Sequence, residues 1–326
     1  MYGQRLHTPS EIQQYIEKSK INFSSDSLVE EFTPKGLTLV DEGYFMVITE
    51  EGYQLEQREF RLSPTAKKYM AKAEKFERRK KIAKSIKFLK RAHDLHPENM
   101  RVMKYLGSLY LENNQAERSI ILLESVVEIN DIDFEAHSLL AVAYHKIGQK
   151  EKALNHISLA HLLNRNHQKI IEILKVIYLK NGMAYANHIF EPKYKITSTD
   201  SLNVSIQANE TPWKAYAACK GVWMYDNDYK NKMMNFANIE IAVVEEKECL
   251  LNALLSYEQM ESGKDAYPLL EYLGTSLEKE MVDDFILYEI KSRENPKLMS
   301  LLPKERLDKV VKYLMTIRVG KEIEVR

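Results

Sequence analysis

The first feature of the sequence that could do chemistry is a run of positive charge, ERRKKIAKSIKFLKR, at residues 77–91. Eight of its fifteen residues are Lys or Arg, and between positions 61 and 91 thirteen basic residues accompany only two acidic ones. Clustered cations of this kind bind the phosphate backbone of nucleic acids. Proteins that bind single strands also carry aromatic rings for base stacking, and the run contains one candidate ring, Phe88.

Two groups of potential metal ligands do not complete a site. The sequence Asp-Asn-Asp at 226–228 begins like a calcium-binding loop, but Asn231 occupies the position of the required glycine and Ala237 that of the bidentate glutamate. Eight of the nine histidines lie between His93 and His188, yet no pair at i, i+4 spacing has a third ligand nearby. We therefore expect no metal site.

The sequence also lacks the local motifs of common enzyme classes. It contains no GxSxG, phosphate-binding loop, dinucleotide-binding glycine pattern or HExxH. The two cysteines, Cys219 and Cys249, are thirty residues apart and indicate buried free thiols in a reducing compartment. We expect a protein without catalytic residues or cofactor, although an enzyme site in the C-terminal half stays open as a third alternative.

The overall composition is that of a soluble globular protein. The 326 residues are 44% hydrophobic and 29% charged, and Lys+Arg balance Asp+Glu at 47 each, so no overall field attracts a polyanion. The N-terminus lacks the apolar segment of a secretory signal, and no stretch of 18 uncharged apolar residues could span a membrane. These features favour a cytoplasmic protein.

A repeat with a period of 34 residues organises the middle of the chain. A shift of 34 places residues 105–126 over residues 139–160 and aligns the same kinds of side chain. In this shift Leu106 aligns with Leu140, Gly107 with Ala141, Tyr110 with Tyr144, Ser119 with Ala153 and Leu123 with Ile157. In each unit the apolar residues recur at i, i+3/i+4 spacing in two segments, which predicts two amphipathic helices.

This pattern resembles the tetratricopeptide repeat family, in about three units within residues 66–181. The matching units are 66–99, 100–133 and 134–167, and a fourth begins at Gln168. A single helical hairpin cannot bury its apolar face, so the units must stack into a superhelix with one concave surface. We expect a mainly α fold, a tetratricopeptide-type α-solenoid with a small N-terminal α+β module and a helical C-terminal region.

The flanking segments give four expected domains. Residues 1–65 form the N-terminal module, with Thr8 and Glu11 as a capping box around Pro9 and with two or three short strands after residue 36. We expect this module to cap the first repeat. Residues 66–190 carry the repeats, and 191–210 are a linker or an irregular strand. Residues 211–326 are helical, either as degenerate repeats or as a separate cap.

The resemblance also implies which residues line the concave groove. These residues come from the first helix of each unit: Met70, Arg101, Lys104, Tyr105, Ser108, Leu139, Val142, His145, Ile173 and Val176. Family members that bind chaperones clamp a peptide carboxylate with Lys, Asn and Arg side chains, and the matching positions here are Met70, Glu74, Tyr105, Glu135 and Leu139. The clamp is therefore missing, and the groove carries an apolar strip that either binds a partner segment or is filled by the flanks of the chain.

The repeat register also sets the place of the basic run. The buried stripe of the first unit's second helix is Ile82, Ser85, Ile86, Leu89 and Ala92, so most of the cations lie on the turn and the outer face. The sequence therefore predicts a protein-interaction scaffold that binds a protein or peptide segment in the groove. The alternative is a nucleic-acid-associated regulator that uses the basic first repeat.

Overall fold

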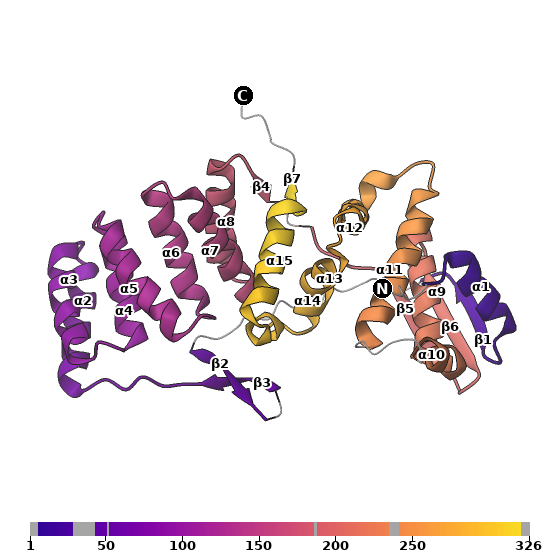
Figure 1. Cartoon of the computed structure of the whole chain (residues 1–326), viewed down its shortest axis with the longest axis horizontal. Coiled ribbons are helices and arrows are strands. Elements are labelled where there is room, and N and C mark those ends of the chain that lie inside the picture. Colours follow the sequence, from indigo (N-terminus) through magenta and orange to yellow (C-terminus); the bar gives the residue numbers. More distant parts are fainter. Residues whose placement is uncertain (1–5, 29–42, 51, 186–187, 235–240, 321–326) are drawn as a thin grey trace. The chain divides into compact units, whose positions relative to one another are not determined.

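The computed structural model describes residues 6–28, 43–50, 52–185, 188–234 and 241–320 (Figure 1). The chain divides into two compact units, each built from two separate segments of the sequence. The first, the sheet unit, combines Met1–Gly36 with Asn187–Ile290. The second, the repeat unit, combines Leu37–Ala186 with Lys291–Arg326.

The repeat unit contains three complete helical hairpins and the first helix of a fourth (Figure 1). Their inner helices are α2 (Pro64–Glu77), α4 (Met100–Glu112), α6 (Phe134–Lys146) and α8 (Gln168–Lys180). The outer helices are α3 (Ile82–Leu95), α5 (Ala116–Ile129) and α7 (Lys150–Leu163). Helices α4, α6 and α8 begin 34 residues apart, as do α3, α5 and α7, which confirms the predicted period and the solenoid fold.

Side chains at equivalent positions of successive repeats cap the inner helices and form hydrogen bonds between the two helices of a hairpin. Asn99 and Asp133 cap α4 and α6 by accepting the backbone N–H of Val102 (3.1 Å) and Ala136 (2.9 Å). In the first two hairpins the hydroxyls of Ser85 and Ser119 donate, each at 2.8 Å, to the carbonyl oxygens of Ala73 and Gly107 on the paired helix. Such bonds between adjacent helices require small residues at the crossing point.

The hairpin crossing of the second repeat has little free space. A Cβ added to Gly107 would lie 3.0 Å from the side chain of Leu123, which is fully buried. A larger side chain at position 107 therefore requires Leu123 to shift, and overpacking of this kind is destabilising.

The C-terminal end of the solenoid is covered by the last segment of the chain. Helix α15 (Lys304–Thr316) packs against α7, and β7 (Val319–Gly320) pairs antiparallel with β4 (Ala184–Tyr185), which follows α8. Met315 and Val319 contact the core of the third repeat.

The N-terminal strands pack on the second and third repeats. Strands β2 (Tyr44–Thr49) and β3 (Gly52–Gln57) form an antiparallel hairpin, and Phe45 on β2 contacts Met100 and Met103 of α4. The side-chain N–H of Asn130, at the end of α5, donates to the carbonyl oxygen of Tyr44 at 2.9 Å. The expectation that these strands cap the first repeat is therefore wrong. Any expected strand before the turn at Asp41 to Gly43 lies outside the described residues.

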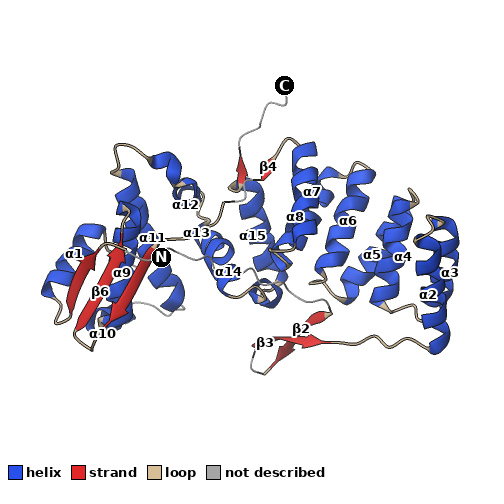
Figure 2. Ribbon diagram, turned by 180° about the vertical axis from the view of Figure 1, so that it is seen from behind, coloured by secondary structure: helices blue, strands red, loops and turns tan. Residues whose placement is uncertain are grey.

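The sheet unit is built around three strands (Figure 2). Strand β6 (Asn203–Ala208) lies in the centre, parallel to β1 (Asn22–Asp26) and antiparallel to β5 (Tyr194–Ser198). The segment 191–210, expected as a linker or an irregular strand, thus contains two regular strands of this sheet. Residues 1–65, expected as one module, contribute α1 (Pro9–Lys18) and β1 to this unit and β2 and β3 to the repeat unit.

Helices complete the sheet unit. They are α9 (Thr211–Tyr225), α10 (Asn227–Met234), α11 (Ile241–Glu258), α12 (Pro268–Glu278) and α13 (Val282–Phe285), followed by a π-helical turn (Ile286–Lys291). Trp213, Tyr216 and Trp223 of α9 are buried. Thr8 and Glu11 form the predicted capping box, in which the Thr8 N–H donates to Glu11 Oε2 at 2.9 Å.

We predict that Gly107→Val destabilises the repeat unit by about 1–3 kcal/mol, because the new side chain overpacks the contact with Leu123. Ala83→Val, on the exposed face of α3, is the matched control and should change stability by no more than about 0.5 kcal/mol. Urea unfolding followed by far-ultraviolet circular dichroism measures both variants. Equal stability of the two variants would contradict the close helix approach.

Candidate functional site

The inner face of the solenoid collects the predicted groove residues. Successive inner helices contact each other directly, α4 with α6 and α6 with α8, which places them on the inside of the curve. Met70 lies on α2, and Ile173 and Val176 lie on α8. The predicted residues on α4 are Arg101, Lys104, Tyr105 and Ser108, and those on α6 are Leu139, Val142 and His145. Their exposure and contacts differ along this face.

The predicted groove residue Lys104 is engaged inside the protein. Its Nζ lies 3.0 Å from Asp133 and 2.7 Å from Glu135, and the residue is only 8% exposed. Burial by itself lowers the pKa of this amine, but the two carboxylates outweigh burial and raise the pKa above its ordinary value. Lys104 therefore stays charged and links α4 to the start of α6.

Three more predicted groove residues also make internal contacts. The hydroxyl of Tyr105 donates to a carboxylate oxygen of Glu77 on α2, and burial, followed by this hydrogen bond, raises the pKa of the phenol. The hydroxyl of Ser108 donates to the carbonyl oxygen of Tyr105 at 2.8 Å. Met70 is buried in the core of the first repeat. Tyr105 links α4 to α2, whereas the Ser108 bond lies within α4.

Exposed apolar surface lies at the far end of the inner face, on α8. Leu139, Val142 and Ile173 are half-buried against the core of the third repeat. Val176 is 56% exposed and Leu179 54% exposed. The predicted apolar strip is therefore open mainly at α8.

A cavity of about 430 Å³ lies at the first-repeat end, near the start of α4. Its walls include the segment 58–62, which precedes α2, together with Lys67, Arg101, Lys104 and Asp133. Among the described residues, Arg61, Lys67 and Arg101 have no ion pair. The sequence analysis identified Arg101 and Lys104 but did not place residues 58–62 beside them, because this segment lies outside the repeat pattern.

Two histidines of the third repeat form a pair. Nδ1 of His137 lies 2.8 Å from Nδ1 of His156, and the two rings stack. Burial, and then the proximity of His137, lower the pKa of His156 to about 3. No group of three potential ligands suited to a metal ion occurs within the described ranges. The pair is a packing contact between α6 and α7.

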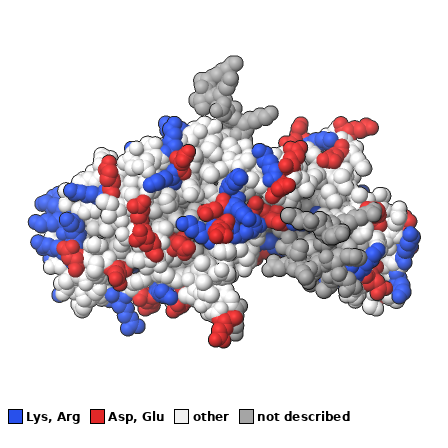
Figure 3. Space-filling view, in the orientation of Figure 1, with Lys and Arg blue, Asp and Glu red and all other residues white. Residues whose placement is uncertain are grey.

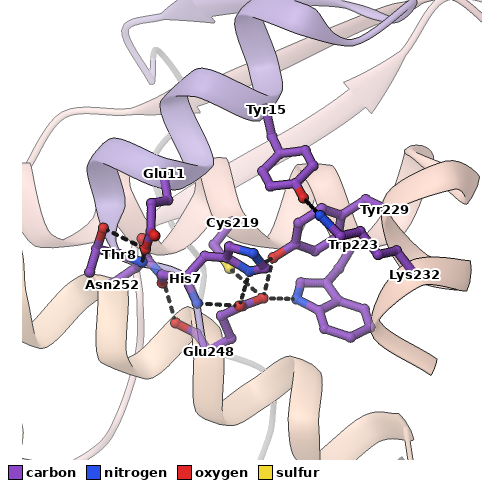
Figure 4. Close-up of polar contacts among 10 residues, drawn as sticks. All are labelled: His7, Thr8, Glu11, Tyr15, Cys219, Trp223, Tyr229, Lys232, Glu248 and Asn252. Carbon is purple, nitrogen blue, oxygen red and sulfur yellow. Dashed lines mark hydrogen bonds and ion pairs between the residues drawn. The ribbon is translucent and has the colours of Figure 1, made fainter. Parts of the chain in front are cut away.

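A second polar cluster, centred on Glu248 of α11, lies in the sheet unit (Figure 4). The Glu248 carboxylate is fully buried and accepts hydrogen bonds from Trp223 Nε1 and the Tyr229 hydroxyl, both at 2.6 Å. The backbone N–H of His7 donates to the same carboxylate at 2.7 Å, and His7 Nδ1 lies 2.9 Å from it. With this set of partners the carboxylate is satisfied, which is the arrangement of a structural group.

The Glu248 cluster attaches the N-terminal segment to α9, α10 and α11. The side-chain N–H of Asn252, one turn after Glu248, donates to the carbonyl oxygen of His7 at 2.9 Å. The sequence analysis missed this cluster, although Val244, Glu248 and Asn252 recur every four residues on one buried face of α11. Polar residues within such a stripe were the available signal.

The match to a known family concerns the repeat helices. Residues 78–141 match the family model of the tetratricopeptide repeat. The matched segment consists of tetratricopeptide repeats. No curated protein matches the chain. Among the described helices, none is long and apolar enough to cross a membrane.

Several solved structures with tetratricopeptide repeats are similar to the chain. The first such domain of Spaghetti (RPAP3), bound to an HSP90 peptide, is 18% identical over 37% of this chain and 98% of that one, with a TM-score of 0.35. The Sgt2 domain from Aspergillus fumigatus is 18% identical over 44% and 96% of the two chains, with a TM-score of 0.36. A repeat protein from Parabacteroides merdae is 14% identical over 78% and 100%, with a TM-score of 0.33.

We predict that the repeat unit loses stability as the pH falls below about 6.5. Unfolded histidines take up protons near that value, whereas folded His156, with a pKa of about 3, does not, so the unfolded state binds more protons between the two values. His156→Gln should lower the slope of the free energy of unfolding against pH by at most about 1.4 kcal/mol per pH unit. Urea unfolding by circular dichroism at about pH 7, 6 and 5 measures the slope, and an unchanged slope would refute the assignment.

We predict that Glu248→Ala destabilises the sheet unit by about 3–5 kcal/mol, because it leaves buried donors of His7, Trp223 and Tyr229 without their acceptor. Glu258→Ala, at the exposed end of the same helix, is the control and should stay within about 0.5 kcal/mol of the parent. Both tryptophans of the chain lie in this unit, so their fluorescence during urea unfolding reports it. A loss below about 1 kcal/mol would show that the cluster is not structural.

Proposed function

We propose that this chain is a non-enzymatic interaction scaffold whose tetratricopeptide repeats hold a peptide or amphipathic helix of a partner protein along the inner face. The observation that carries the proposal is the open apolar surface on α8, where Val176 and Leu179 are more than half exposed. Large apolar side chains that are exposed next to each other on one helix mark an interaction surface more often than a solvated one.

The inner face offers a partner two kinds of contact. Val176 and Leu179, with the half-buried Leu139, Val142 and Ile173 beside them, supply apolar anchors. At the other end, the cations Lys67 and Arg101 of the cavity supply unpaired positive charge. Apolar anchors give most of the affinity of such an interface, and charges at its rim set register and association rate.

The partner segment differs from the carboxylate-terminated peptides that chaperone-binding members of the family hold. Such a clamp needs basic and amide side chains, whereas Met70 is buried here, Tyr105 is bound to Glu77, and Leu139 is apolar. The amine of Lys104 is balanced by Asp133 and Glu135. We therefore propose an internal segment of a partner as the ligand, and a cytoplasmic location in keeping with the two free cysteines.

We predict that Val176→Glu combined with Leu179→Glu weakens partner binding by at least about tenfold, since it places two charges where apolar anchors are needed. Both positions are exposed, so the repeat unit should unfold at the same urea concentration as the parent. The control is Ile121→Glu, a 67% exposed apolar residue on the outer helix α5.

The partner is first identified with a photo-crosslinking amino acid at position 176, compared with the same amino acid at position 121. Its affinity for the parent and for both variants is then measured with purified proteins. A partner that crosslinks equally from both positions, or that binds the double variant as tightly as the parent, would rule out the inner face as the binding site.

A further inference from the structure

The first hairpin exposes the face that each later hairpin packs against the hairpin before it. We call this face the outer face of the first hairpin. In later repeats the residues equivalent to Lys72 and Phe76 are buried against the preceding outer helix. Leu106 and Tyr110 share a core cluster with residues of α3, and Leu140 and Tyr144 share one with residues of α5. Leu106 is 2% exposed and Leu140 is fully buried, whereas Lys72 is exposed. In the described part of the chain, α2 and α3 pack against each other and against α4.

Three aromatic rings lie on this face. The rings of Phe76 and Phe88 stack with centroids 5.4 Å apart, and Tyr69 lies 6.4 Å from Phe88. All three side chains are half-buried. Since Tyr69 and Phe76 come from α2 and Phe88 from α3, the rings form one apolar surface across both helices of the hairpin.

Three exposed cations border the rings. Lys84 lies 5.8 Å from the centre of the Phe76 ring, and Lys72 lies 5.5 Å from that of Phe88. Arg91 lies 5.8 Å from the Tyr69 ring and 5.7 Å from the Phe88 ring. Among the described residues none of these cations has a carboxylate partner. Figure 3 shows Lys and Arg gathered over the α2–α3 end of the repeat unit. The face is therefore apolar in its centre and positive at its border.

The third repeat shows what such a face binds when it is covered. There Tyr144 and His156 stack with centroids 5.4 Å apart, and Lys152 lies 4.7 Å over the Tyr144 ring. Tyr144, His156 and Lys152 are equivalent to Phe76, Phe88 and Lys84 by two successive 34-residue shifts. The covering element is α5, whose Glu124 accepts a hydrogen bond from the Tyr144 hydroxyl and whose Ile120 and Leu123 lie in the same core cluster. An amphipathic helix with a carboxylate thus covers this face within the array.

We propose that the outer face of the first hairpin, formed by Tyr69, Lys72, Phe76, Lys84, Phe88 and Arg91, binds an acidic amphipathic helix of a partner protein. The helix stacks on α2 and α3 as α5 stacks on α6, with its apolar side chains on the rings and its carboxylates beside the unpaired cations. This surface is separate from the inner face and does not depend on the function proposed for it. At the other end of the solenoid the chain supplies its own cap, α15.

The same face fits nucleic acid less well. Single-stranded nucleic acid binds by stacking its bases on open ring faces. Here Lys72, Lys84 and Arg91 already lie over the ring faces, in cation–π contact. A stacked base must displace these cations, whereas an acidic helix brings carboxylates that pair with them.

The probe is a fluorescein-labelled synthetic peptide with the sequence of α5, Ala116–Ile129, in which Arg118→Glu increases its acidity. Anisotropy titration with the full chain at about 50 mM salt should give saturable binding. Lys72→Glu combined with Lys84→Glu should weaken peptide binding by about tenfold or more. A second peptide, with Lys in place of the glutamates, should bind this charge-reversed variant. The matched control is Lys87→Glu with Lys90→Glu, on α3 away from the rings, which changes net charge equally.

Val176→Glu with Leu179→Glu should leave peptide binding unchanged, which separates this surface from the inner face. Absence of saturable binding would overturn the proposal, and so would an equal loss in the control pair, which would show attraction by charge alone. Tighter binding of an oligouridine probe than of the peptide, lost in Phe76→Ala with Phe88→Ala, would assign the face to nucleic acid and also overturn it.

Discussion

A helical hairpin of this size cannot bury its apolar stripe by itself, and this constraint determines most of the repeat unit. The inner helices α4, α6 and α8 place a leucine and a tyrosine, such as Leu140 and Tyr144, against the outer helix of the hairpin before them. Small residues such as Ser119 and Gly107 allow the two helices of one hairpin to approach within hydrogen-bonding distance. Every hairpin therefore depends on a neighbour, and the hairpin at each end of the array lacks one on its outer side.

The chain treats the two ends differently. At the C-terminal end, α15 and the short β4–β7 pair cover the third repeat and α8. At the N-terminal end, lysine replaces leucine at position 72, and the surrounding surface is positive. The β2–β3 hairpin, which could have served as the missing neighbour, packs instead on the second and third repeats through Phe45 and Tyr44. One end is thus closed by the chain itself, and the other, within the described residues, carries exposed cations.

The sequence predicted the features that depend on local periodicity. The hairpins, their 34-residue spacing and the capping box at Thr8 follow from side-chain spacing along one or two helices, and all three are present. Contacts between distant segments were not predictable in this way. The pairing of β1 with β6 joins Asn22 to Asn203, and nothing local in either strand specifies the other.

The groove residues show the same limit. The family register placed Lys104 and Tyr105 on the inner helices, but their carboxylate partners decide whether they are available to a ligand. Glu77 and Glu135 also lie on inner-face positions, so the pattern alone could not distinguish an internal ion pair from a free cation. The cavity beside Arg101 likewise requires residues 58–62, whose course depends on packing outside the repeats.

The contact between His7 and Glu248 joins residues separated by 241 positions, and the repeats lie between them in the sequence. During synthesis at about 5–20 residues per second, the N-terminal segment is made roughly 10–50 s before its partner helix α11. The repeats α2 to α7, which need only local contacts, are complete during this interval. The solenoid helices are therefore synthesised before the sheet unit can close, and α15, which caps the solenoid, is synthesised last.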